Sequence, residues 1–177
     1  MKKTLIVIDM QNDFVYGPLG TPEAKAIVPN VKKKIEEYRE CFEDVVFTLD
    51  CHDFDYIYTH EGRYLPVEHC MANDPRRGYE LVIPSIAGEE RLLKETFGAM
   101  DLQHLLHVKF SPIIEVVGVC TDICVVSNAL YLRTICPEAD IIVDASCCAG
   151  TTPERHKAAL EVMKSCHIDV INEGEER

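Results

Sequence analysis

The sequence predicts an α/β fold of three α-β-α layers, in which helices cover both faces of a doubly wound, mainly parallel sheet of about six strands, as in Rossmann-like proteins. Short β-branched apolar runs, such as residues 4–10, 44–50 and 113–120, alternate with longer amphipathic segments. Runs that are apolar on both faces are typical of strands covered by helices on two sides. The alternation of strand and helix patterns is typical of one doubly wound domain, which we expect to span residues 1–177.

Further segments complete this pattern. Thr152, Pro153 and Glu154 supply an N-cap, a proline in the first turn and an acidic first-turn residue, which predicts the start of a helix. The other strands are expected at 91–97, 140–146 and 168–172, and the helices at 23–40, near 100–107, 122–135 and 153–166.

Composition excludes several classes of protein. Thirty Asp and Glu against eighteen Lys and Arg give a net charge of -12, which disfavours a nucleic-acid partner because phosphates demand a basic surface. No apolar run approaches the ~20 residues of a membrane span. The N-terminal apolar run ends at Asp9, too early for an export signal. We therefore expect a cytoplasmic protein that does not bind membranes.

The chain has nine cysteines, at positions 41, 51, 70, 120, 124, 136, 147, 148 and 166. Their number is odd, and no C-x-x-C pair occurs. This pattern disfavours a disulfide framework and predicts reduced thiols, most of them in the core.

Acidic residues end two of the predicted strands, and ligands of doubly wound folds bind beyond such carboxyl ends. Asp9 ends the first strand and Asp50 the second, while Lys94 lies in the segment 91–97. Asp9 could take a proton from a thiol and return it to a leaving amine, with Lys94 as a nearby cation. Alternatively, Asp9 caps a turn and Lys94 is an exposed lysine at a strand edge.

Cys124 is the candidate nucleophile. It falls in the first turn of a helix that we expect Thr121 or Asp122 to cap. A helix N-terminus lowers the pKa of a thiol and offers amide groups to an oxyanion. Alternatively, Cys124 is a buried residue that packs this helix on the sheet.

A second group of polar residues lies in the stretch 51–88, whose periodicity is poor. The pattern D-x-H at 50–52 is followed by H-E at 60–61 and H-C at 69–70. Mixed oxygen and nitrogen donors suit Zn²⁺, Fe²⁺ or Mn²⁺ better than Ca²⁺ or Mg²⁺. The alternative is a polar surface loop whose histidines cap turns.

Several strings occur together and cover nearly the whole chain. They are LIVIDMQNDF (5–14), FTLDCHD (47–53), EGRYLPVEHC (61–70), LLKETFGAM (92–100), VVGVCTDICVVSNAL (116–130) and DASCCAGTTPERHKAAL (144–160). In this order they resemble the isochorismatase-like cysteine hydrolase superfamily, in its nicotinamidase-related amidase branch.

The resemblance implies a catalytic triad of Asp9, Lys94 and Cys124. It also implies a cis peptide bond between Val119 and Cys120, which would bring the amide groups of Cys120 and Cys124 together as an oxyanion hole.

A divalent metal beside the triad is also implied, with zinc expected and iron or manganese as alternatives. Asp50 and His69 would bind it together with a third ligand. The string E-G-x-x-L-P-x-x-H-C favours Glu61 as that ligand, His52 is kept as a possible ligand, and His60 is a weaker candidate.

The activity implied is hydrolysis of a small carboxamide through a cysteine thioester, most simply nicotinamide to nicotinate and ammonia. The chain has no Trp, so it departs from the W-P-x-H-C pattern of nicotinamidases, and Phe14 and Tyr64 are the candidate aromatic walls for the substrate.

Other readings stay open. The alternatives within the superfamily are an N-carbamoyl compound or ureidoacrylate as the substrate, or isochorismatase activity. A non-catalytic metal or thiol-redox protein is the alternative of a different class. Relatives are usually oligomers, which implies a homodimer or a larger assembly.

Overall fold

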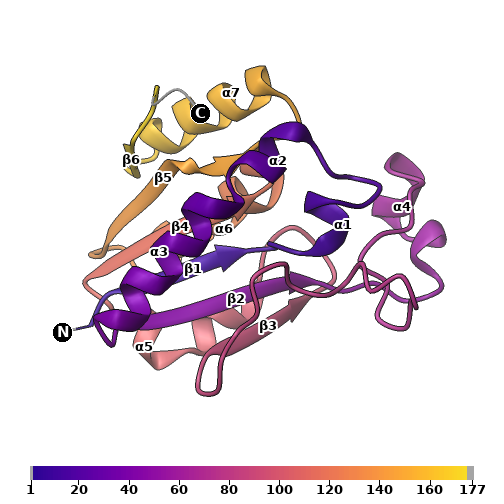
Figure 1. Ribbon diagram of the computed structural model, residues 1–177. Coiled ribbons are helices and arrows are strands. Elements are labelled where there is room, and N and C mark those ends of the chain that lie inside the picture. The colour runs from indigo at the N-terminus through magenta and orange to yellow at the C-terminus, as the bar shows by residue number, and fades with distance from the viewer. Residues whose placement is uncertain (1, 175–177) are drawn as a thin grey trace.

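The computed structural model describes residues 2–174 and contains a six-stranded, all-parallel sheet between two layers of helices (Figure 1), which confirms the predicted fold class. The strand order is β3-β2-β1-β4-β5-β6. The strands are β1 (Thr4–Ile8), β2 (Asp44–Asp50), β3 (Glu90–Lys94), β4 (Ile113–Val119), β5 (Asp140–Ala149) and β6 (Asp169–Ile171).

The helices connect these strands in the expected alternation. The α-helices are α1 (Asn12–Val15), α2 (Pro22–Ala26), α3 (Val28–Glu40), α4 (His60–Tyr64), α5 (Leu106–Lys109), α6 (Val126–Ile135) and α7 (Pro153–Ser165). Two 3-10 turns, η1 (Tyr56–Tyr58) and η2 (Met100–His104), and one π-helical turn, η3 (Thr121–Val125), complete the set.

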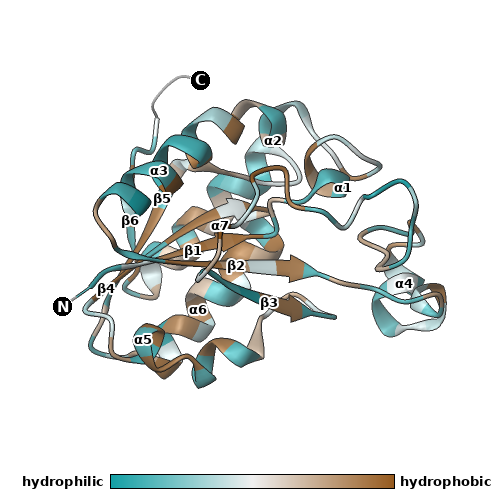
Figure 2. Cartoon of the chain, turned by 60° about the horizontal axis from the view of Figure 1, so that its bottom comes forward, coloured by the Kyte–Doolittle hydropathy of each residue, from teal (hydrophilic) through white to brown (hydrophobic). Residues whose placement is uncertain are grey.

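The core lies on both faces of the sheet because successive side chains of a strand point to opposite sides. In β1, Leu5 and Val7 pack with the helices α2 and α3, whereas Ile6 and Ile8 pack with α6 and α7. Every residue of β1 is fully buried. Figure 2 accordingly shows hydrophobic central strands between helices that carry hydrophilic surfaces.

Several predicted elements differ from the observed ones. The strand expected at 91–97 ends at Lys94, and residues 95–97 form no regular element. The expected helix 23–40 is divided at Ile27 into α2 and α3. Pro29 lies in the first turn of α3, and proline cannot donate the amide hydrogen bond that a continuous helix requires there. The expected helix near 100–107 consists of the short turns η2 and α5.

The predicted cap of the helix after β4 is wrong, whereas the predicted start of α7 is confirmed. Cys120 occupies the N-cap position before η3, without a side-chain cap. The Asp122 carboxylate instead accepts hydrogen bonds from the Thr151 amide (2.7 Å) and hydroxyl (2.6 Å). At α7, the Thr152 hydroxyl accepts a hydrogen bond from the Arg155 amide (3.2 Å).

All nine cysteines are free thiols, as the sequence predicts. Among the helices of residues 2–174, none combines the length and apolar character needed to cross a bilayer.

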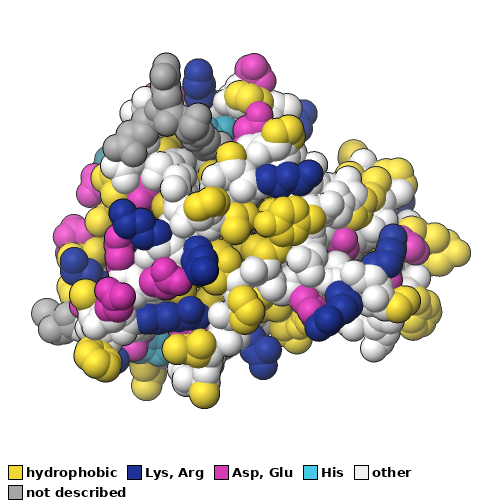
Figure 3. All heavy atoms as spheres, viewed as in Figure 1, with side chains coloured by type: hydrophobic (Ala, Val, Ile, Leu, Met, Phe, Trp, Pro, Cys, Tyr) yellow, Lys and Arg dark blue, Asp and Glu magenta, His cyan; other side chains and the backbone are white. Residues whose placement is uncertain are grey.

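A buried network of ion pairs links α3 to the strands β4 and β5. The Lys34 ammonium lies 2.6 Å from Glu115 in β4 and 2.8 Å from Asp144 in β5. The Tyr38 hydroxyl donates a further hydrogen bond to Glu115 (2.8 Å). Burial raises the pKa of Asp144, but its hydrogen bonds with Lys34 and Ser146 outweigh this effect and lower the pKa overall. The outer face of α3 is solvated, and Figure 3 shows acidic and basic side chains mixed over this region.

Replacing Lys34 with Met is expected to destabilise the protein by ~3 kcal/mol, because two buried carboxylates would lose their cation. Lys32→Met on the same helix is the matched control. Lys32 forms only an exposed ion pair with Glu36 (3.8 Å), so its loss should cost at most ~0.5 kcal/mol. Urea denaturation of both variants measures the difference, and equal stabilities would contradict the structural role of Lys34.

Candidate active site

The candidate site lies at the carboxyl edge of the sheet, where four neighbouring strands end. Asp9 follows β1, Asp50 ends β2, Lys94 ends β3, and Cys124 lies in η3, just after β4. Parallel strands bring such ends together. All four side chains belong to residues that are at least 95% buried.

The Lys94 ammonium connects the other three side chains. Its Nζ atom lies 2.7 Å from Asp9 Oδ2, 3.1 Å from Asp50 Oδ1 and 3.6 Å from Cys124 Sγ. Burial lowers the pKa of Lys94, but the charges of the carboxylates Asp9 and Asp50 outweigh that effect and raise it overall. Lys94 is therefore a permanent cation at the centre of this group.

Asp9 is held in a left-handed backbone conformation (φ 48°) directly after its strand. The Thr48 hydroxyl donates a 2.6 Å hydrogen bond to Oδ1 of Asp9, which leaves Oδ2 facing Lys94. Burial raises the pKa of Asp9, and the Lys94 charge offsets this only in part. A carboxyl group whose pKa is raised is a stronger proton acceptor than an ordinary carboxylate.

The Cys124 thiol does not follow the expectation of a lowered pKa. Burial raises its pKa well above the usual value, the charge of Asp9 raises it further, and the Lys94 ammonium only partly opposes them. The helix N-terminus that suggested activation is thus outweighed by burial. A thiol of this kind needs a base before it can act as a nucleophile.

The backbone before Cys124 has two unusual features. The peptide bond between Val119 and Cys120 is cis, as the family resemblance implies. Gly118, just before it, has φ 120°, and a Cβ atom there would collide with the carbonyl oxygen of Ile8 in β1. Glycine is therefore required where β4 turns toward the site.

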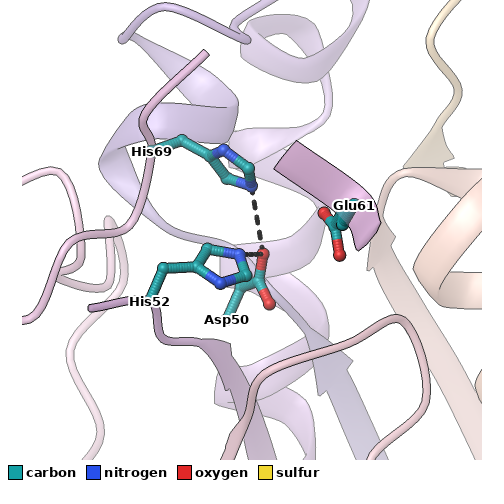
Figure 4. A group of neighbouring side chains, drawn as sticks. All are labelled: Asp50, His52, Glu61 and His69. Carbon is teal, nitrogen blue, oxygen red and sulfur yellow. Dashed lines mark hydrogen bonds and ion pairs between the residues drawn. The ribbon is translucent and has the colours of Figure 1, made fainter. Parts of the chain in front are cut away.

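A second cluster begins at the other oxygen of Asp50 (Figure 4). His52 Nε2 and His69 Nε2 lie 3.0 and 3.3 Å from Asp50 Oδ2, and the Glu61 carboxylate faces them from α4. One candidate ligand atom from each of these four residues lies within 4.8 Å of all the others. Histidine hydrogen bonds lower the pKa of Asp50 overall, although burial acts in the opposite direction.

The hydrogen bonding of His69 fits a cation at this cluster. Its Nδ1 atom lies 2.8 Å from the Val67 carbonyl oxygen, to which it can donate. In that tautomer the lone pair of Nε2 points toward Asp50, which suits a shared metal ion. Nitrogen and oxygen donors together favour zinc, iron or manganese. His60 instead packs against Tyr64, with ring centroids 5.1 Å apart, and is not part of the cluster.

A pocket of about 880 Å³ opens over both groups. Phe14 and Tyr64, the two aromatic residues selected from the sequence, both line it. Phe14 is buried edge-on against His69, whereas Tyr64 is 81% exposed at the mouth. The pocket is also lined by Cys124, Cys120, Asp50, Glu61, His69, Glu95, Phe97, Ile123, Thr151 and Arg155, among others.

Sequence reasoning did not select four residues that support this site. Thr48 bonds to Asp9, Gln11 binds both backbone groups of Asp50, Asn128 bonds to the Cys124 carbonyl, and Arg155 lines the pocket. Thr48 could have been noticed as a polar residue inside an apolar strand. The other three contacts depend on tertiary structure.

The chain matches the family model described as "Isochorismatase domain" over residues 3–174. A nicotinamidase of Schizosaccharomyces pombe is 26% identical, with the alignment covering 96% of this chain and 92% of that protein.

Two solved structures share the fold over nearly their full length. The pyrazinamidase of Pyrococcus horikoshii in complex with zinc has a TM-score of 0.85 and 28% identity, covering 97% of this chain and 99% of that one. The N-carbamoylsarcosine amidase of Thermoplasma acidophilum has a TM-score of 0.79 and 27% identity, covering 100% and 99%.

We expect the purified protein to bind close to one Zn²⁺ per chain, measured by elemental analysis after dialysis. His69→Ala should lower the zinc affinity by at least ~10-fold, because the cluster loses an imidazole donor. His60→Ala is the matched control and should bind zinc like the unchanged protein. Equal zinc binding by the His69 and His60 variants would refute this ligand set.

Proposed function

The chain belongs to the isochorismatase family, and from this premise we propose that it hydrolyses a small carboxamide, nicotinamide, to the carboxylic acid and ammonia. The observation that carries the proposal is the Lys94 ammonium, which lies in contact with both Asp9 and Cys124. An acid, a cation and a thiol in one buried group fit nucleophilic catalysis better than a structural role. The nicotinamidase and pyrazinamidase relatives support this substrate class.

The first half of the reaction forms a thioester. Asp9 takes the proton of the Cys124 thiol while Lys94 stabilises the negative charge that develops on sulfur. The sulfur attacks the carboxamide carbon, and the amide groups of Cys120 and Cys124 are the proposed donors to the oxyanion. When this intermediate collapses, Asp9 returns its proton to the leaving nitrogen and ammonia departs.

The second half removes the acyl group. Asp9 accepts a proton from water, the resulting hydroxide attacks the thioester, and the carbon–sulfur bond breaks. Asp9 then returns its proton to the Cys124 sulfur, which restores the thiol, and the acid product leaves. The raised pKa of Asp9 favours both steps, because it makes this carboxylate a better proton acceptor.

Asp50, His69 and Glu61, with His52 as a further donor, are the residues proposed to hold the divalent metal. When bound, the metal would supply a Lewis acid that orients the substrate and polarises water. Phe14 and Tyr64 are the proposed aromatic contacts for a flat ring.

An N-carbamoyl amino acid or a related ureido acid is the second candidate substrate. Arg155 lies in the pocket wall, where its guanidinium could bind a substrate carboxylate in a bidentate manner. Nicotinamide has no carboxylate for this arginine. The N-carbamoylsarcosine amidase with the same fold supports this candidate.

We also propose that the protein acts in the cytoplasm as a homodimer or larger assembly. Nine free thiols fit a reducing compartment, and the family resemblance is the support for an oligomer.

Cys124→Ala should abolish ammonia release from nicotinamide, with a fall of at least ~1,000-fold in kcat, because no thioester can form. Cys41→Ala removes an exposed thiol and should leave kcat unchanged. Circular dichroism checks that both variants are folded. If the folded Cys124→Ala variant still turned over nicotinamide, the thioester mechanism would be wrong.

Arg155→Gln decides between the two substrates. If an N-carbamoyl amino acid is the substrate, kcat/KM for it should fall ~10- to 100-fold, because a charged hydrogen bond contributes about 1.5–3 kcal/mol. The kcat/KM for nicotinamide should stay within about twofold of the original. Lys157→Gln, an exposed position further along α7, is the control. Equal losses for both substrates would contradict a carboxylate contact at Arg155.

A further inference from the structure

The side chain of Asn128 joins the two segments that carry the triad. Asn128 lies in α6, one helical turn after Cys124, and is fully buried. Its Nδ2 donates to the carbonyl oxygens of Cys124 (2.8 Å) and Phe97 (3.0 Å), and its Oδ1 accepts from the Ala99 amide (2.8 Å). One amide group thus uses both donors and its acceptor.

The segment that Asn128 holds begins directly after Lys94. The strand β3 is an edge strand in the described sheet and pairs with β2. Residues 95–97, which follow it, are exposed and form no regular element. The two bonds from Asn128 to Phe97 and Ala99 therefore fix this connection within five residues of Lys94.

The same residues shape the pocket. Phe97 lines the pocket and is 43% exposed. The bond from Asn128 to the Phe97 carbonyl fixes the backbone from which this ring projects.

We propose that Asn128 is a positioning residue, which holds Lys94 against the Cys124 thiol by linking the Cys124 turn to the loop after β3. Asn128 contacts no reacting atom. Its effect on turnover rests on the proposed amidase function, whereas its effect on the reactivity of Cys124 does not.

A serine at this position would separate the helical contact from the loop contacts. In the preceding residue, the Ser127 hydroxyl donates to the Ile123 carbonyl four residues earlier (2.6 Å). Asn128→Ser can make the equivalent bond to Cys124 but is too short to reach Phe97 or Ala99. If the loop contacts matter, serine should behave like alanine.

The first experiment compares Asn128→Ala and Asn128→Ser in nicotinamide hydrolysis. Both should lower kcat on the order of 10- to 100-fold with little change in KM, as a displacement of about 1 Å in a reacting group does. Ser111→Ala is the matched control, because its buried hydroxyl also joins separate segments, through Lys2 and Ile113, far from the site. That variant should keep its kcat. A folded Asn128→Ser protein with an unchanged kcat would overturn the proposal. If Asn128→Ala does not fold, the result for Asn128→Ser alone decides.

The second experiment is a double-mutant cycle on the rate at which iodoacetamide alkylates Cys124, followed by peptide mass spectrometry. Asn128→Ser should slow alkylation by about 10-fold in the Lys94 protein and have less than a twofold effect in the Lys94→Gln background. Exposed Cys41 is the internal reference. A similar effect in both backgrounds would mean general loosening and would refute positioning through Lys94. Because this cycle needs no amidase activity, it decides the role of Asn128 even if nicotinamide is not hydrolysed.

Discussion

The site depends on one buried cation. The Lys94 ammonium lies between two carboxylates and a thiol, in a region from which water is largely excluded. A lone ammonium at this depth would lose its proton, and the two lone carboxylates would gain one. Each group can therefore stay charged at this depth only because the oppositely charged groups lie beside it. The convergence of four parallel strand ends is what brings these charges within contact distance.

Asp50 connects the charged group around Lys94 with the cluster of candidate metal ligands. One of its oxygens faces Lys94 and the other faces the histidines His52 and His69. The side chain of Gln11 pairs with the backbone amide and carbonyl of Asp50 (2.8 Å each), which holds the backbone from which the carboxylate projects. The candidate triad and the candidate metal ligands therefore share Asp50 as a common contact, and a shift of Asp50 would displace both groups.

The pocket combines two kinds of lining residue. Its floor consists of buried ionisable groups, whereas its walls include exposed Tyr64, Phe97 and Arg155. In the proposed mechanism, groups on the floor contact the reacting atoms and determine which bond can be broken. In the same proposal, wall residues contact the rest of the substrate and determine which molecule binds. Such a division would allow one fold to serve different amides, and the solved structures that share this fold include a pyrazinamidase and an N-carbamoylsarcosine amidase.

The sequence alone was sufficient for the α/β fold, the acidic strand ends Asp9 and Asp50 and the start of α7, because each depends on local periodicity or capping chemistry. Family motifs also selected the residues that the structure brings together around Lys94. Only the tertiary structure decided the direction of the Cys124 pKa, the partner of Asp122 and the three hydrogen bonds of Asn128. Burial and contacts between distant segments control these properties, and neither leaves a periodic pattern in the chain.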